Sequence, residues 1–404
     1  MNYYKRTADA LLQDLLDAFG AVLIEGPKWC GKTTTASQLA NSILRMQDPS
    51  MREEYLATAK TKPSILLKGD TPRLIDEWQD APMLWDAVRT TVDDRQIPGQ
   101  FILTGSNAVD KSQIHHSGAG RIARLRMLPM SLWESQESTG EVSLKELFNN
   151  PDYDIDGKMS KMTVEDLIFA ASRGGWPASL LARTPKAQLL VAKNYVQTIC
   201  SDDVSGIDGK KRDAKLTSMI LRAYARNVST LVKKKSLLDD VTSSGEVSCH
   251  VDTFDDYVSA LEKLFVIQNI SAWCPAIRSK TAIRSSVKRC FCDPSIPIAL
   301  LGLSPESLSM QLRTFGFIFE QMCIRDLKAY TIDLNSHVSY YHDRYDLEAD
   351  IVLHLEDGRY ALIECKLGSS EIDEGAKHLL ELKRLIQEHN KTEKQVPIRE
   401  PDLL

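Results

Sequence analysis

A short apolar run that leads straight into a glycine-bounded loop constrains this chain more than any other feature. Residues 21–25 read Ala-Val-Leu-Ile-Glu between two glycines, a pattern typical of a buried strand in a parallel sheet. Helical spacing begins near Lys32. The loop between them satisfies G-x-x-x-x-G-K-S/T, which predicts a phosphate-binding turn between a strand and a helix. Its residues are Gly26, Pro27, Lys28, Trp29, Cys30, Gly31, Lys32 and Thr33.

Each part of this loop is suited to a nucleotide. Successive backbone N–H groups and the helix N-terminus surround the β-phosphate, Lys32 neutralises oxygens of the β- and γ-phosphates, and Thr33 gives Mg²⁺ a hydroxyl ligand. We therefore predict ATP and Mg²⁺ as the cofactors. The predicted nucleotide-binding residues are 26–33 together with Thr34.

A strand that ends in two carboxylates provides the second half of such a site. Short apolar runs at 64–67, 73–75 and 101–103 alternate with helical stretches, which predicts a parallel sheet. The middle run leads into Asp76 and Glu77. We predict that Asp76 holds the metal through water and that Glu77 orients the attacking water. These residues indicate a nucleoside-triphosphate hydrolase, with phosphoryl transfer to water as its reaction.

Two further residues are candidates for contact with the γ-phosphate. The run at 101–103 ends in small polar residues, where a γ-phosphate sensor is expected; we choose Ser106, with Thr104 and Asn107 as alternatives. Arg121 opens a basic stretch and is the candidate to complete a charge clamp, in its own or in a neighbouring subunit. The second case requires a homo-oligomer.

These strings resemble the bacterial and archaeal AAA-like ATPases that carry a C-terminal domain of unknown function. The resemblance rests on residues 24–33, 74–79, 103–106 and 119–121, and it extends through Gly-Gly-Trp-Pro at 174–177 into the tail. It implies an α/β chain with a P-loop NTPase core on a parallel sheet, a helical lid, a winged-helix-like segment and a restriction-endonuclease-like α/β tail. The expected boundaries are 1–140 for the AAA-type core, 141–205 for the lid, 206–290 for the winged-helix-like segment and 291–404 for the nuclease-like domain.

Composition agrees with a multidomain protein that has sizeable hydrophobic cores. The 404 residues are 43% hydrophobic and 26% charged, and no apolar run approaches the ~18 residues that a membrane-spanning helix needs. The N-terminus lacks the layout of a secretory signal, so we expect a cytoplasmic protein without membrane association. The eight cysteines form no C-x-x-C pair and give no support for zinc.

The tail contains a second group of acidic and basic residues with a recognisable spacing. Asp350 precedes the string Glu364-x-Lys366, and Glu320 lies on the helix expected before them. If residues 356–358 form a three-residue hairpin loop, Asp350 faces Glu364 and Lys366 shares their face. A two-residue turn would shift the register by one and separate the group.

On a shared face, these residues suit a Mg²⁺-dependent phosphodiesterase and resemble the PD-(D/E)xK nuclease fold. Asp350 and Glu364 are then predicted to bind metal, Glu320 to add a ligand through water, and Lys366 to position the nucleophilic water. A relic of that fold, which binds without cleaving, is the alternative interpretation.

Contacts with double-stranded DNA are expected from local basic clusters, because the net charge of −5 argues against a wholly electrostatic binder. Residues 276–289 hold five basic side chains and no acidic one, and further clusters lie at 210–212 and 233–235. A wing would place such residues along a duplex backbone, whereas the alternative is a solvated surface. We therefore expect an ATPase that couples nucleotide state to a DNA-associated, nuclease-like tail. The alternative is a nucleotide-gated switch or scaffold whose tail binds a partner or nucleic acid without cleavage.

Overall fold

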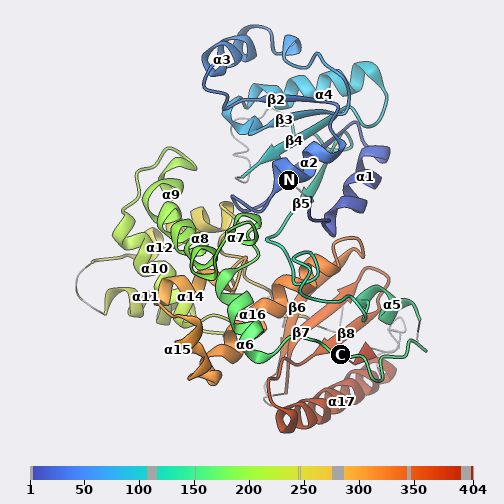
Figure 1. Cartoon of the computed structure of the whole chain (residues 1–404), viewed down its shortest axis with the longest axis vertical. Helices are drawn as coiled ribbons and strands as arrows, with labels where there is room; N and C mark the ends of the chain where they lie inside the picture. The colour runs from blue at the N-terminus through green and yellow to red at the C-terminus, as the bar shows by residue number, and fades with distance from the viewer. Residues whose placement is uncertain are drawn as a thin grey trace.

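The computed structural model describes residues 3–106, 116–150, 152–243, 245, 247–274, 286–343, 347–392 and 402–403. Three parts can be followed in Figure 1: an N-terminal sheet covered by helices, a helical body beside it, and a C-terminal sheet next to the long last helix. The predicted α/β class with a parallel-sheet core is confirmed.

The N-terminal sheet has five strands in the order β2-β3-β4-β1-β5, and all neighbouring pairs are parallel. All residues of β1 and β4, the second and third strands from one edge, are buried, which explains why they read as uninterrupted apolar runs. The strands are β1 (Ala21–Glu25), β2 (Ser42–Arg45), β3 (Arg73–Asp76), β4 (Phe101–Gly105) and β5 (Ile122–Arg126).

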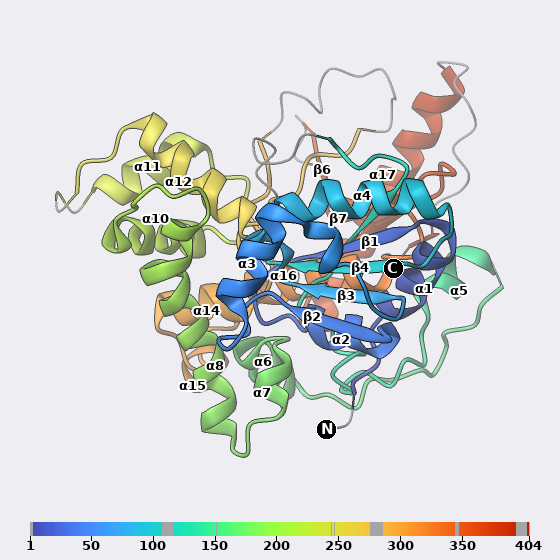
Figure 2. The same ribbon diagram turned by 90° about the horizontal axis from the view of Figure 1, so that it is seen from above.

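Alternate residues of each strand enter different cores. Val22 and Ile24 pack with α1 (Ala8–Ala18) and α2 (Lys32–Leu39) on one face of the sheet. Ala21 and Leu23 pack on the other face, with α3 (Arg52–Thr61) and α4 (Met83–Arg95). The 90° view of Figure 2 shows helices on both sides of these strands. The strand period of two residues thus supplies both cores from one short segment.

One expected strand is wrong and one strand was missed. Residues 64–67 form no strand; a 3₁₀ turn, η1 (Pro63–Ile65), leads instead to the buried Leu66 and Leu67. Pro63 has no N–H to donate to a ladder, and its fixed φ suits the first position of a helical turn. The edge strand β2 was missed because its four residues are too few to display a period and, unlike the equally short β3, it does not end in a carboxylate.

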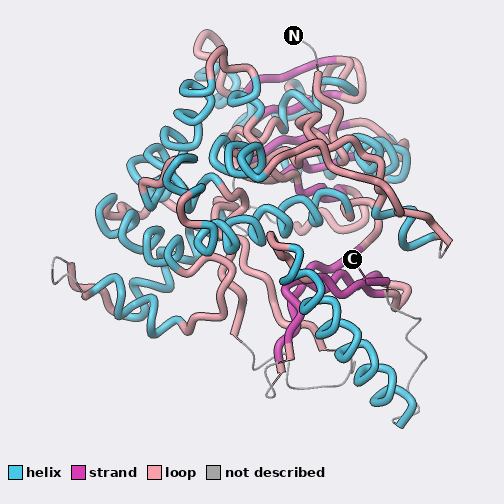
Figure 3. Tube along the Cα trace, turned by 60° about the horizontal axis from the view of Figure 1, so that its bottom comes forward, coloured by secondary structure: helices cyan, strands magenta, loops and turns pink. Residues whose placement is uncertain are grey.

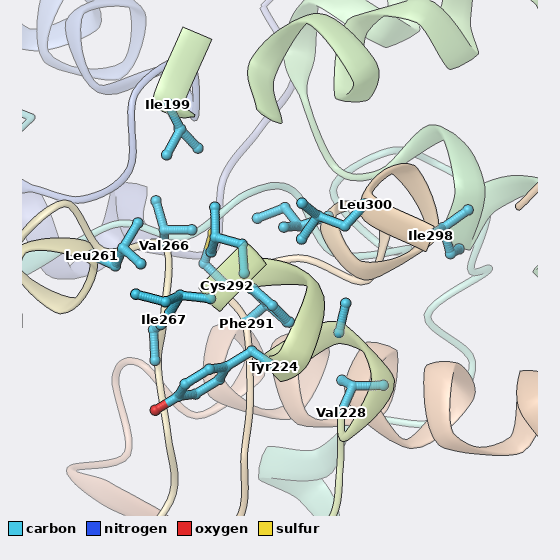
Figure 4. Close-up of a cluster of buried hydrophobic side chains, with 14 of the residues drawn as sticks. Ile199, Tyr224, Val228, Leu261, Val266, Ile267, Phe291, Cys292, Ile298 and Leu300 are labelled. Carbon is cyan, nitrogen blue, oxygen red and sulfur yellow. The ribbon is translucent and has the colours of Figure 1, made fainter. Parts of the chain in front are cut away.

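The helical body follows residue 163 and shares one large core. Figure 4 shows part of this cluster, in which Ile199, Tyr224, Leu261 and Phe291 come from segments far apart in the sequence. Its elements are α6 (Val164–Arg173), α7 (Pro177–Leu180), α8 (Pro185–Thr198), the π-helical turn η4 (Ile199–Asp203), α9 (Val204–Gly206), α10 (Ala214–Arg226), α11 (Lys234–Thr242), α12 (Val251–Lys263), α14 (Ser295–Leu301) and α15 (Pro305–Ser309). After α12, antiparallel bridges join Ile267 to Phe291 and Ile270 to Lys288.

The C-terminal sheet has the order β6-β7-β8-β9 and two covered faces. Ile351 and Leu353 pack with α16, whereas Val352 and Leu362 pack with α17. Figure 3 shows the last helix running along this sheet. The elements are α16 (Leu312–Tyr330), β6 (Ser336–His342), β7 (Glu348–Leu355), β8 (Tyr360–Ile363), α17 (Ser369–Thr392) and β9 (Asp402–Leu403); a short helix, α5 (Leu144–Asn149), lies beside them in Figure 1.

The hairpin between β7 and β8 has the register expected for a three-residue loop. Leu355 donates its N–H to the carbonyl of Arg359, and Gly358 has a φ of 87°. The paired residues run from His354 opposite Tyr360 to Ile351 opposite Ile363. One further step along the same register places Asp350 opposite Glu364, so this prediction is confirmed.

Candidate functional site: a nucleotide pocket and a distant carboxylate cluster

The glycine loop lies at the carboxyl end of β1, and two of its glycines have backbone conformations that favour glycine. Gly26 has a φ of 155°, and a Cβ there would lie 2.2 Å from the carbonyl oxygen of Met127. Gly31 has a φ of 100° and immediately precedes α2. The glycine spacing of the motif therefore reflects a backbone that passes close to a neighbouring segment and then turns into a helix.

Two buried cationic side chains, Lys32 of the loop itself and Arg6 from the segment before α1, donate hydrogen bonds to main-chain carbonyls of the loop. The Nζ of Lys32 donates to the carbonyl oxygens of Gly26 (3.0 Å) and Pro27 (2.9 Å). Arg6 donates to the carbonyl of Cys30 (2.7 Å) and forms an ion pair with Glu134 (3.0 Å). Sequence reasoning missed Arg6, because a single arginine before the first helix carries no motif.

The acidic strand end meets the loop at Asp76. One oxygen of this carboxylate, Oδ1, accepts hydrogen bonds from the hydroxyls of Thr33 (2.7 Å) and Thr104 (2.6 Å). The contact forms because β1, β4 and β3 are neighbours that end at one edge of the sheet. A hydroxyl and a carboxylate oxygen are hard ligands that suit Mg²⁺, which takes its remaining ligands from phosphates and water. The residues present fit this metal.

Glu77 and Ser106 also meet at this edge. Glu77 has a φ of 55°, and its Oε2 lies 3.1 Å from the Oγ of Ser106. Gln79, which sequence reasoning did not identify, donates its amide to Glu77. Thr104 is fully buried against Asp76, whereas Ser106 lines the open cavity; Asn107 lies outside the described residues.

A cavity of about 1210 Å³ opens between this edge and the helical body. One wall is formed by the glycine loop, Glu77 and Ser106; the other comes from α7, α8 and the segment 202–209. Lys28 spans the two walls, because its Nζ lies 2.6 Å from an oxygen of Asp203 in η4. The ring of Trp29 lies 5.4 Å from that of Tyr195 in α8. The cavity is large enough for a nucleotide.

Arg121 lies at the opposite edge of the sheet. It precedes β5, and its main-chain carbonyl accepts a hydrogen bond from Ala21 at the start of β1. Its side chain forms an ion pair with Asp93 of α4 (2.7 Å). Because the glycine loop follows the other end of β1, Arg121 does not reach the loop of its own chain. The prediction that Arg121 contacts the γ-phosphate bound to its own subunit is therefore wrong. Contact with the γ-phosphate of a neighbouring subunit stays a prediction.

The tail residues Glu320, Asp350, Glu364 and Lys366 do converge. Lys366 lies 2.7 Å from Oε2 of Glu364 and 3.9 Å from Oδ2 of Asp350. The other oxygen of Glu364, Oε1, is buried and accepts no hydrogen bond from any residue that the structure describes. Burial and the charge of Asp350 raise the pKa of Glu364 to about 7. The pKa of Glu320, raised chiefly by burial, is about 8.

Lys288 is an unexpected member of this carboxylate cluster. Its ammonium donates to Glu320 and to the main-chain carbonyl of Asp350 (2.9 Å), and it lies 3.8 Å from Oδ1 of Asp350. Burial lowers the pKa of Lys288, but the charges of Glu320 and Asp350 outweigh it and raise the pKa overall. Two ammonium groups thus already offset most of the negative charge of the three carboxylates, and the cluster fits a divalent cation less well than the nucleotide pocket does.

The expected basic face is largely neutralised where the structure describes it. Lys288 and Arg289 are buried rather than on a wing, and Arg278, Lys280 and Arg284 lie outside the described residues. Because both side chains are buried, the prediction that Lys288 and Arg289 contact the backbone of a DNA duplex is wrong. In the other two clusters, three of the six basic side chains have acidic partners: Lys210 and Arg212 pair with Asp256, and Lys234 pairs with Asp255.

Comparison with known families adds to this geometry. Residues 18–136 match the model of an AAA domain. Residues 164–307 and 315–400 match the models of two domains of unknown function, DUF8612 and DUF4143. The N-terminal part of the chain is therefore similar to AAA domains, and the two regions that follow match families without an assigned function.

Its relatives include two uncharacterized proteins, one from Mycobacterium bovis and one from Mycobacterium tuberculosis. Each is 24% identical over 366 residues, which cover 88% of this chain and 72% of the relative. Among solved structures, a Walker-type ATPase of Pyrococcus abyssi matches with a TM-score of 0.43 and 12% identity, over 74% of this chain and 96% of that one. Within the described residues, no helix is long and apolar enough to cross a membrane.

Proposed function

We propose that this protein is a Mg²⁺-dependent ATPase. The observation that carries the proposal is the meeting of Thr33 and Asp76 beside the glycine loop, with Glu77 and Ser106 in the same cavity. Lys32 and the loop amides would hold the phosphates, and Thr33 and Asp76 would hold the metal. The carboxylate of Glu77, kept in place by Ser106 and Gln79, would orient the water that attacks the γ-phosphate.

The test is nucleotide binding followed by phosphate release, both on the full chain. Calorimetry with Mg²⁺ and ATP should detect binding to the wild type and none to Lys32→Ala, because the substitution removes the cation that faces the phosphates. Lys366→Ala is the matched control: it removes a lysine at the distant cluster and should bind ATP normally. A wild type that binds no nucleotide would overturn the proposal.

A chain of buried contacts supports coupling between the nucleotide pocket and the tail. The ring of Tyr195 lies 4.1 Å from that of Trp176, whose Nε1 donates to Ser295 (3.0 Å). Ser295 in turn donates to Asp293, and Asp293 pairs with Arg325 of α16 at 3.0 Å. Since α16 also carries Glu320, the same rigid helix joins this network to the carboxylate cluster. Movement of α8 and the segment around Trp176 would therefore displace α16 and, with it, the carboxylate cluster of the tail.

For the tail itself, two functions are supported by different observations. Asp350 and Glu364 both lie within 4 Å of Lys366, and one oxygen of Glu364 accepts no hydrogen bond from a described residue, which favours a metal-dependent phosphodiesterase. The buried ammonium of Lys288 favours the second candidate, a nucleotide-gated switch whose tail binds a partner or nucleic acid without cutting it.

Cleavage of plasmid DNA in the presence of ATP and either Mg²⁺ or Mn²⁺ separates the two tail functions. A phosphodiesterase nicks the plasmid, and Lys366→Ala abolishes the nicking while ATP hydrolysis continues. The switch leaves the plasmid intact under every condition. Lys32→Ala, tested beside it, shows whether any nicking depends on nucleotide.

A further inference from the structure

The ion pair between Lys28 and Asp203 joins the two walls of the nucleotide pocket. Lys28 belongs to the glycine loop, whereas Asp203 ends the π-helical turn η4 of the helical body. Both side chains line the cavity that also contains Lys32 and Thr33. An ammonium that lies in a phosphate-binding loop but is bonded to a carboxylate of another part of the chain has two competing partners.

We propose that Lys28 exchanges Asp203 for the triphosphate when nucleotide binds, so that the lid and the γ-phosphate compete for one ammonium. This inference rests on the proposed ATPase function and names a regulation of the same site. Its ligand is a nucleoside triphosphate, which carries more negative charge than one carboxylate and lies on the loop to which Lys28 belongs.

The burial of the two partners favours movement of the lysine and then of the lid. The Lys28 side chain is 40% exposed and has a long flexible stem, whereas that of Asp203 is 8% exposed. Once Lys28 turns to the phosphates, Asp203 is left as a buried carboxylate without its cation beside a polyanion. Such a group is costly to keep in place, so the segment 199–203 moves away from the pocket.

The position of Asp203 suits such a movement. It lies in a single π-helical turn between α8 and α9, a local irregularity that is common at functional sites. The same stretch follows Tyr195, which contacts both Trp29 of the loop and Trp176 of the lid. Release of Asp203 therefore acts on the segment from which the contacts toward α16 begin.

A double-mutant cycle on the full chain tests this exchange. The probe is the non-hydrolysable triphosphate adenylyl imidodiphosphate with Mg²⁺, and ADP with Mg²⁺ is the reference ligand, both measured by calorimetry. Asp203→Asn should tighten binding of the triphosphate by about threefold, because the competing carboxylate is gone. Lys28→Met should weaken binding of the triphosphate more than binding of ADP.

The neighbouring carboxylate provides the matched control. Asp202 lines the same cavity but accepts a hydrogen bond from Ser201. Asp202→Asn removes the same charge without breaking the pair, so it should change affinity less than Asp203→Asn does. In the Lys28→Met background the gain from Asp203→Asn should disappear, which separates competition for the lysine from general charge repulsion.

Three results are decisive. If Asp203→Asn matches Asp202→Asn, or keeps its gain without Lys28, the exchange is overturned even though ATP binds. Weaker triphosphate binding by Asp203→Asn would show that the pair supports the pocket instead, and would also overturn it. Absence of binding by the wild type would reject the ATPase proposal itself, and the exchange with it.

Discussion

The carboxylates of the nucleotide pocket and those of the tail are bonded by different kinds of groups. In the nucleotide pocket, Asp76 accepts hydrogen bonds from the hydroxyls of Thr33 and Thr104, which carry no charge. In the tail, the carboxylates pair with the ammonium groups of Lys288 and Lys366. A carboxylate bonded only to hydroxyls retains its charge for an incoming cation, whereas one bonded to ammonium already has its counter-ion.

This difference separates two regions that look alike in the sequence, where each appears as acids at a strand end. The nucleotide pocket can bind charged ligands, namely Mg²⁺ and a triphosphate, and its cavity is open to solvent. In the tail cluster, Glu320 and Lys288 are buried, and most of the charge is paired within the cluster. We therefore expect substitutions in the nucleotide pocket to change ligand binding and turnover, and substitutions in the tail cluster to change stability.

The largest expected effect is the loss of turnover on removal of Glu77. Glu77→Gln keeps the shape and the hydrogen bond from Ser106 but cannot accept a proton, so kcat for ATP hydrolysis should fall by about a hundredfold or more. Affinity for ATP should change by less than about twofold. A phosphate-release assay measures the rate. Glu364→Gln makes the same change at the tail cluster and should leave turnover unaltered; equal losses would erase the distinction between the two clusters.

The next effect concerns the stability of the tail cluster. Lys288→Met removes the ammonium that hydrogen-bonds the buried Glu320. Because the pKa of Glu320 is already about 8, the carboxyl takes up a proton, and the unmade buried hydrogen bonds should lower the free energy of unfolding by about 2 kcal/mol. The double variant Lys288→Met with Glu320→Met should recover most of this loss, because an apolar pair fills the same space. Lys366→Met, at a position 30% exposed, should cost about 1 kcal/mol or less. Denaturant unfolding measures all three. Equal losses of unfolding free energy for Lys288→Met and Lys366→Met would show that burial of the lysine does not determine its contribution to stability.

The smallest effect comes from the ion pair between the buried Arg212 and Asp208, a carboxylate that lines the nucleotide cavity and is 20% exposed. Hydrogen bonds from Arg212 lower the pKa of Asp208 to about 2. A folded-state pKa below the unfolded value means that the stabilisation is present above pH 3.8 and is lost as the pH falls toward 2. After allowance for solvent screening, Asp208→Asn should cost less than about 1 kcal/mol at pH 6 and almost nothing near pH 2. Urea midpoints at several pH values measure it; a cost independent of pH would show that charge is not involved.

Much of the nucleotide site could be predicted because its parts lie in short strings. The glycine loop, the acidic strand end and Ser106 are each defined by a few neighbouring residues, and parallel strands bring such strand ends to one edge. The register of the tail hairpin was predictable for the same reason, since a three-residue loop determines which residues are opposite.

Other residues could not be found in this way. Arg6, Gln79 and Lys288 act through contacts that only packing creates, and no local pattern marks them. Arg121 was misplaced within its own chain because a basic residue near a strand gives no information on which end of the sheet it occupies. The apolar run at 64–67 was wrongly predicted to be a strand, because turns can also contain buried apolar residues.

The sequence by itself determined the class of the N-terminal domain, the phosphate loop and the two acids that follow it, because backbone geometry and strand order at this kind of site depend on local residue types. Only the tertiary structure decided which charges meet: Lys28 with Asp203, and Lys288 with Glu320. The physical reason is that the energy of a charged group depends on its neighbours in space and on its access to water. Neither quantity is local in the chain.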